Sequence, residues 1–249
     1  GLDSFVFIDD MPTERENIKM RLPQVTVPEF PGVKEKIPQF FYQVYEDYFK
    51  KTKSTKEDVE KTRQYQDNEK RFLSREGVDH DTFLKSLEMK ATRVPFEGKA
   101  KERVAQLMAK TNQFNVTTRR YSLPELEEKV LSGWEVYAYQ VEDKFGDYGI
   151  VCAILIDTRE WRVDSFLMSC RIMGKLVENY CVEQVERDLA EKGVEKLKAE
   201  YIPSAKNAPV KGLYPGLGYR LVLEDKSHTV YELELGEKPV RKYFVQEKL

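Results

Sequence analysis

The stretch Asp164–Lys175 (Asp-Ser-Phe-Leu-Met-Ser-Cys-Arg-Ile-Met-Gly-Lys) combines residue types that could hold an anion. The pattern predicts a strand, then a turn that carries Arg171 and Gly174, then the start of a helix. Unpaired backbone N–H groups and the positive end of the helix would face one point, and glycine permits close approach. A pyrophosphate or a phosphopantetheine group suits such a turn, although a glycine turn with a solvated arginine fits the spacing as well.

Cys170 is the candidate nucleophile of the same stretch. It lies directly before the predicted helix and beside Arg171, two features that lower the pKa of a thiol and raise its thiolate fraction. The alternative is that Cys170 is a small buried hydrophobe, as isolated cysteines usually are. Cys152 in a predicted strand and Cys181 on the apolar face of a predicted helix are both expected in the core.

A second stretch, Tyr201–Tyr219, predicts a strand, a polar turn, a helix and a glycine-rich bend. Together the two stretches resemble the GNAT acyltransferase fold, in which an Arg-x-x-Gly-x-Gly/Ala loop binds the coenzyme A pyrophosphate. Arg171–Leu176 matches that loop except at its last position, where Leu176 would crowd the pyrophosphate. The residues that the resemblance assigns to cofactor binding are Met168, Ser169, Arg171, Ile172, Met173, Gly174, Lys175 and Asn207.

The GNAT resemblance also implies roles for two residues of the second stretch. Asn207 would orient the pantetheine, and Tyr214 would protonate the departing thiolate as a general acid. Packing of the Tyr214 ring at the end of the helix is the alternative.

A closer resemblance covers nearly the whole chain and is carried by several long, unusual strings. These are Phe5–Arg15, Leu22–Glu29, Thr55–Asp58, Lys110–Tyr121, Asp143–Gly149 and Ser165–Arg171. The strings resemble the FkbH-like proteins, which join a haloacid-dehalogenase-type phosphatase domain to a GNAT-like domain. The resemblance implies transfer of a glyceryl-type acyl group to a carrier-protein or coenzyme A thiol in polyketide-type biosynthesis. It further implies an acyl carrier protein as partner, an acyl-CoA or phosphopantetheine thioester as cofactor, and a covalent thioester on Cys170.

Asp9 and Asp10 follow a short apolar run and would lie at the end of a strand, a position that suits Mg²⁺. In the family these acidic residues help hold the metal, but the nucleophile strand DxDx[TV] and the Ser/Thr and Lys that precede them do not occur in this sequence. We therefore expect a remnant metal site, Mg²⁺ only together with an upstream domain, and no phosphatase activity from this chain by itself.

The string Lys110–Tyr121 offers a substrate cleft. Asn112 and Gln113 carry amide donors, and Arg119 or Arg120 could meet a phosphate. The alternative is a loop whose polar groups bond to one another.

Hydrophobic periodicity predicts an α/β protein of three parts. Residues 1–35 are expected to form a βαβ tail of a haloacid-dehalogenase-type (Rossmann-like) domain, as in a piece of a longer protein. A helical linker region would cover 36–87, with helices over 36–49 and 55–75. Residues 88–249 are expected to form a GNAT-like mixed sheet flanked by helices. The pattern predicts a strand over 90–94, helices over 98–110, 123–131 and 174–191, and further helical turns over 208–214.

Composition excludes several classes of function. The 249 residues include 41 Lys+Arg and 43 Asp+Glu. The sequence has no basic stripe of the kind that would indicate nucleic-acid binding. No apolar run approaches the roughly 18 residues of a membrane span. Three cysteines without a CxxC fit a reducing compartment, so we expect a cytoplasmic protein. With only two histidines, the sequence has few candidate residues for a catalytic triad or a histidine metal site.

Two alternatives to acyl transfer onto a carrier-protein or coenzyme A thiol remain. One is a catalytically silent GNAT-like module that docks a carrier protein, and the other is a small-molecule N-acetyltransferase. A homodimer is a further expectation, because an uncovered parallel sheet edge invites pairing.

Overall fold

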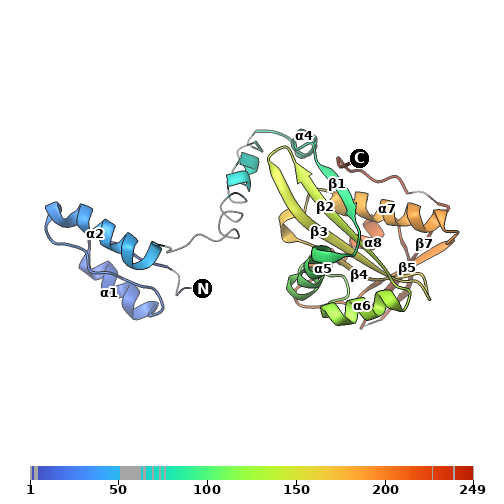
Figure 1. Ribbon diagram of the computed structural model, residues 1–249, viewed down its shortest axis with the longest axis horizontal. Coiled ribbons are helices and arrows are strands. Elements are labelled where there is room, and N and C mark those ends of the chain that lie inside the picture. The colour runs from blue at the N-terminus through green and yellow to red at the C-terminus, as the bar shows by residue number, and fades with distance from the viewer. Residues whose placement is uncertain are drawn as a thin grey trace. The chain divides into compact units, whose positions relative to one another are not determined.

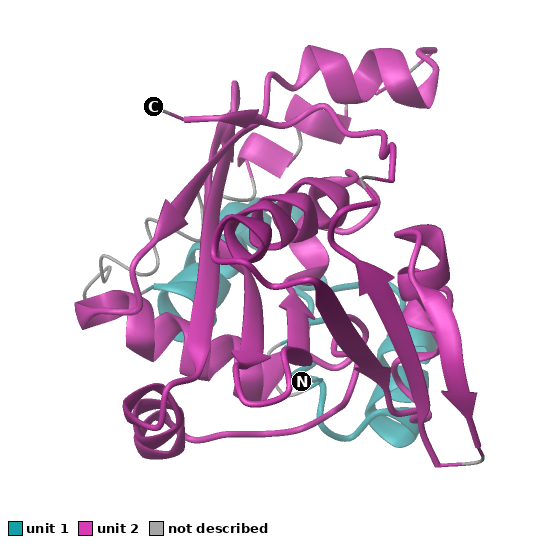
Figure 2. Cartoon of the chain, turned by 90° about the vertical axis from the view of Figure 1, so that its right-hand side faces the viewer, with its two compact units in different colours: residues 1–62 teal, residues 63–249 magenta. Residues whose placement is uncertain are grey.

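A computed structural model describes residues 2, 5–50, 63, 66–68, 70–72, 74–75, 77–225, 227–237 and 239–248. The chain divides into two compact units, residues 1–62 and residues 63–249, which Figure 2 shows in different colours. The string Thr55–Asp58 and much of the helix predicted over 55–75 lie outside the described residues.

The described residues of the first unit form two α-helices and little sheet. Its elements are α1 (Pro12–Arg21), a 3-10 turn (Lys34–Lys36), α2 (Ile37–Val44) and a π-helical turn (Tyr45–Phe49). The expected βαβ tail is only partly formed, because its two strands reduce to one parallel bridge between Val6 and Thr26. Among the described residues no further strand lies beside this bridge to extend it, so the ladder stops after one pair.

The second unit is an eight-stranded mixed sheet with helices on both faces (Figure 1). Its strands are β1 (Lys90–Val94), β2 (Glu135–Asp143), β3 (Gly146–Asp157), β4 (Arg162–Met168), β5 (Lys196–Tyr201), β6 (Arg220–Glu224), β7 (Thr229–Glu234) and β8 (Gln246–Glu247). Its helices are α4 (His80–Ser86), α5 (Gly98–Lys110), α6 (Leu123–Leu131), α7 (Val177–Glu191) and α8 (Leu213–Gly216), with 3-10 turns at Cys170–Ile172 and Ala208–Val210. The strand order is β6-β7-β5-β4-β3-β2-β1-β8.

Alternation of side chains along the central strands divides the core into two layers. Helices α5 and α6 bury Val104, Met108 and Leu126 against Ala153 and Leu167 on one face of the sheet. Helix α7 buries Cys181, Val185 and Leu189, among others, against the opposite face, where Val210, Tyr214 and Leu217 of the α8 region also pack. The predicted class, a mixed sheet flanked by helices, is therefore confirmed for this part of the chain.

The differences from the expected elements have local causes. Helix α7 begins at Val177 rather than at Gly174, because Gly174 and Leu176 have φ values of +74° and +58° and cannot continue a right-handed helix. The helical stretch expected over 208–214 is split into a 3-10 turn and α8, with Gly212 preceding the latter. None of the helices in the described part of the chain is long and apolar enough to cross a membrane.

Candidate functional site

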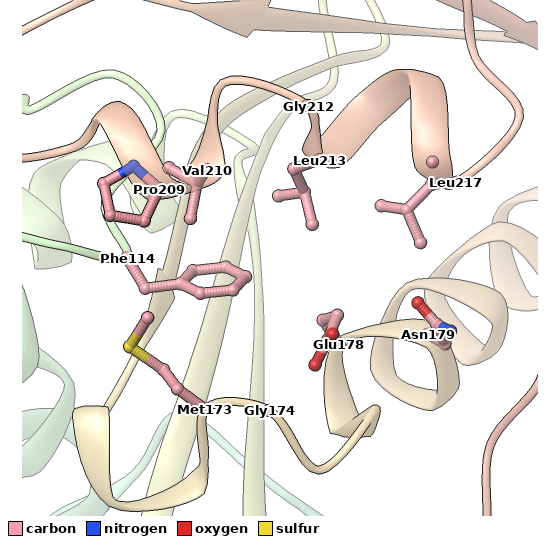
Figure 3. A pocket seen from close by; sticks show the side chains of 11 residues that line it. Phe114, Met173, Gly174, Glu178, Asn179, Pro209, Val210, Gly212, Leu213 and Leu217 are labelled. Carbon is pink, nitrogen blue, oxygen red and sulfur yellow. The ribbon is translucent and has the colours of Figure 1, made fainter.

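A cavity of about 430 Å³ opens between the first turn of α7 and helix α8 (Figure 3). One side is formed by the end of the loop after β4 and by α7, and the other by the segment that leads into and through α8. The residues that line it are Phe114, Met173, Gly174, Glu178, Asn179, Pro209, Val210, Gly212, Leu213, Gly216 and Leu217. The volume lies in the range of small-molecule sites.

The loop after β4 brings two of the residues predicted to bind a cofactor, Met173 and Gly174, to this cavity. Gly174 is exposed and lines the cavity, and Met173 lies beside it. Lys175 turns back on the loop, since its Nζ donates to the carbonyl of Arg171 at 2.9 Å. Arg171 Nε donates to Ser169 Oγ at 3.4 Å. Of the residues predicted to bind a cofactor, the structure places Met173 and Gly174 on the cavity wall, and the role of the whole set stays a prediction.

The space between β4 and β5 is filled by the chain itself. These parallel strands pair only at Arg162–Lys198 and Val163–Ala199. Beyond that point the loop between α5 and α6 inserts. Val116 N donates to the carbonyl of Phe166 at 3.3 Å, Met168 N donates to that of Phe114 at 3.0 Å, and Ile202 N donates to that of Val116 at 2.9 Å. The edge of β4 is thus paired within the chain.

Asn207 fixes this inserted segment, and its side chain is fully buried. Its Nδ2 donates to the carbonyls of Asn115 at 2.9 Å and Ile202 at 3.0 Å. Its Oδ1 accepts from Ser204 N at 2.8 Å and from the Tyr201 hydroxyl at 3.3 Å. Both donors and the acceptor are therefore engaged, which leaves the amide no free donor for the predicted contact with pantetheine.

Tyr214 is only 1% exposed, and its ring packs 5.3 Å from that of Tyr219 and 5.6 Å from that of Tyr231. Its hydroxyl has no hydrogen-bond partner among the described residues. Burial is the first cause that raises the pKa of Tyr214, and the negative charges of Glu200 and Asp164 add to it. The hydroxyl therefore stays protonated at neutral pH, in the state a general acid needs, but Tyr214 does not line the cavity.

The three cysteines differ in accessibility. Cys170 is exposed, in the 3-10 turn that follows β4, whereas Cys152 and Cys181 are fully buried, as predicted for a core role. Burial, together with a hydrogen bond to Cys152, raises the pKa of the Cys181 thiol. Cys170 is thus the accessible thiol of the described residues, and its role as nucleophile stays a prediction.

Of the four residues predicted to line a substrate cleft, Arg119 pairs with residues of the neighbouring strands and the other three are exposed. Arg119 forms ion pairs with Asp164 at 2.9 Å and Glu200 at 2.7 Å. Arg120 donates to the exposed Asn112 at 2.7 Å. Gln113 is also exposed, and none of the four lines the cavity. Their role in substrate binding remains a prediction.

Asp9 and Asp10 lie in the first unit, at the start of α1. Asp9 Oδ1 accepts from Met11 N at 2.8 Å, while the carbonyls of both residues accept from the buried Arg15 guanidinium. In the described part of the chain no cluster of three or more His, Cys, Asp or Glu side chains is arranged to hold a metal ion. The Mg²⁺ role of this pair stays a prediction.

Glu178 is a residue of the cavity that the sequence analysis missed. It lies in the first turn of α7, and its carboxyl faces the cavity near Phe114 and Leu213 (Figure 3). Burial raises the pKa of Glu178, and its own backbone N–H opposes that effect. The signal available in the sequence was an acidic residue four positions after Gly174 of the predicted anion-binding turn.

In comparisons with known proteins, the structure of this chain is similar to several solved structures. No family model matches the chain, and no curated protein matches it either. The ribosomal-protein-S18-alanine N-acetyltransferase from Escherichia coli is similar with a TM-score of 0.45 and 11% identity, covering 63% of this chain and 99% of that one. The PaiA N-acetyltransferase from Thermoplasma acidophilum, solved with coenzyme A, gives a TM-score of 0.44 and 10% identity, covering 59% and 98%.

A GNAT-family acetyltransferase from Listeria monocytogenes is similar with a TM-score of 0.42 and 16% identity, covering 59% of this chain and 95% of that one. The fold class stated above rests on the strand order of this chain and on the packing of its helices, not on these similarities.

Proposed function

We propose that the second unit takes part in acyl transfer to a thiol and supplies the part that binds the thioester arm. The observation that carries the proposal is the cavity between the first turn of α7 and α8, which has apolar side chains such as Phe114, Val210 and Leu213 on its walls and the glycine turn at its rim. A pantetheine arm, which is long, thin and largely uncharged, suits such a cavity. Its phosphate would stay outside the cavity.

Cys170 is the residue we propose to exchange the acyl group. Its thiolate would attack the thioester carbonyl, forming a new thioester on Cys170 and releasing the pantetheine thiol. The reverse step onto a carrier-protein thiol completes the transfer. Exposure supports this role, since an enclosed thiol could not reach the arm of a separate protein. The glyceryl-type acyl group and the acyl carrier protein are taken from the FkbH-like resemblance and belong to the proposal.

A second candidate function is a silent module that docks a carrier protein without chemistry. The observation that favours it is the closed gap between β4 and β5, where Asn207 and the edge of β4 are already paired within the chain. The burial of Tyr214 points the same way, because a general acid must reach the leaving group.

Intact-mass analysis after incubation with an acyl-pantetheine thioester separates the two candidates. Acyl transfer predicts one added acyl group that is lost in Cys170→Ala and kept in Cys181→Ala, where the removed thiol is buried. The docking module predicts no adduct, together with saturable binding of a phosphopantetheinylated carrier protein. No adduct and no carrier binding would contradict both candidates.

A further inference from the structure

Glu178 is the only charged side chain among the described residues that line the cavity. Its Oε2 atom is buried and has no hydrogen-bond partner within the described chain. A carboxylate oxygen that is taken out of water without a partner costs free energy, so the Oε2 atom of Glu178 calls for a donor from a ligand.

No other described side chain that lines the cavity carries a charge. Phe114, Val210, Leu213 and Leu217 present apolar surface (Figure 3). Asn179 is the other polar side chain of the wall, and its Nδ2 already donates to the carbonyl of Lys242 at 2.8 Å. The cavity therefore combines an apolar surface with a single acceptor that carries negative charge.

We infer that Glu178 determines the specificity of this cavity: it accepts a hydrogen bond from an amide N–H of an uncharged pantetheine-like arm and keeps phosphate groups outside. The inference rests on the proposed function, which places such an arm in the cavity. An amide N–H is a donor that satisfies the carboxylate, whereas a phosphate beside Glu178 would set like charges close together in an apolar environment. The first turn of α7 thus selects against an anion at this point, although a helix N-terminus generally attracts one.

A matched series of ligands tests the inference. Pantetheine and 4′-phosphopantetheine differ by one phosphate, and their dissociation constants can be measured by calorimetry at pH 8 for the intact chain. We expect pantetheine to bind about fivefold more tightly than 4′-phosphopantetheine, as one additional like-charge contact near the surface would produce. In Glu178→Gln, which keeps the shape and an acceptor oxygen, the ratio should fall to about one.

Glu191→Gln is the control, because it removes the same charge from an exposed position at the other end of α7. It should leave the ratio at the wild-type value. Equal affinities in the wild type, or a ratio that Glu178→Gln does not change, would overturn the inference and leave the proposed arm-binding site standing. Failure of both ligands to bind would overturn the inference and the proposed arm-binding site together.

Discussion

The gap between β4 and β5 and the cavity beside α7 both include Phe114, but they differ in the hydrogen bonding of their polar groups. In the gap, the edge of β4 is paired with the inserted loop, and both ends of the Asn207 amide are engaged. In the cavity, Glu178 keeps a buried oxygen without a partner in the described chain. The difference supports a structural role for the gap and the proposal that the cavity receives a ligand.

Residues that the GNAT resemblance assigns to one site lie in different regions of the structure. Asn207 belongs to the closed region and Gly174 to the open one, although both match positions of the same acyltransferase pattern. Substitutions in the closed region should therefore lower stability, and substitutions in the open region should change binding.

Phe114→Ala should have the largest effect, because Phe114 belongs to both regions. The side chain is 5% exposed, and its ring packs 5.3 Å from that of Phe166. We expect the free energy of unfolding, measured by urea denaturation, to fall by about 3–4 kcal/mol. Phe72→Ala, at a position that is 69% exposed, should change it by no more than about 0.5 kcal/mol. A loss below about 1 kcal/mol for Phe114→Ala would show that the loop does not fill the gap.

Asn207→Ala should lower the free energy of unfolding by about 2–3 kcal/mol. The substitution leaves the carbonyls of Asn115 and Ile202 without the donors they have now, and buried unpaired groups are costly. Asn112→Ala removes the same side chain from an exposed site and should change stability little. Similar losses for the two variants would contradict the structural role of Asn207.

Glu178→Gln should raise the free energy of unfolding by about 1 kcal/mol at pH 8, because it removes a charge whose Oε2 atom is buried without a partner in the described chain. Burial raises the pKa of Glu178 above that of the unfolded chain, so the wild type loses stability as pH rises through the folded pKa. Glutamine does not titrate, and the advantage should therefore disappear toward pH 4. Urea denaturation at both pH values measures this, and an equal advantage at pH 4 and pH 8 would refute the titration as its cause.

Tyr214→Phe should have the smallest effect on stability, within about 0.5 kcal/mol, because the hydroxyl has no partner in the described chain to lose. Tyr201→Phe is the matched variant. It removes a hydroxyl that donates to Asn207 and should cost about 1 kcal/mol. Thermal denaturation of the pair tests the contrast. An equal loss in both would mean that the Tyr214 hydroxyl is bonded in the folded protein.

Local patterns predicted much of the second unit. The strand Lys90–Val94 and the helices over 98–110 and 123–131 have the expected bounds, since apolar periodicity and capping act within a few residues. The start of α7 was placed too early because the left-handed backbone at Leu176 is unusual for a residue with a Cβ atom.

The candidate site was less accessible to sequence reasoning. The glycine turn at Gly174 could be recognised from its neighbours, and the structure places it at the cavity rim. The pairing of Val116 with Phe166 and Ile202 joins segments far apart in the chain, so no local pattern reports it. Whether Asn207 faces a ligand or its own backbone is decided by the same distant contacts. The isolation of Glu178 also becomes visible only once the cavity walls are assembled.

The most direct test of the central claim, that the cavity beside α7 receives the arm of a carrier protein, is a calorimetric titration with a phosphopantetheinylated carrier protein. Gly212 lines the cavity, has an ordinary φ of −89°, and would direct a Cβ into open space, so Gly212→Phe should fill the cavity without backbone strain. Gly236→Phe, also in open space but away from the cavity, is the control. We expect binding at least about tenfold weaker for Gly212→Phe and unchanged for the control. Equal binding by the wild type and Gly212→Phe would contradict the claim.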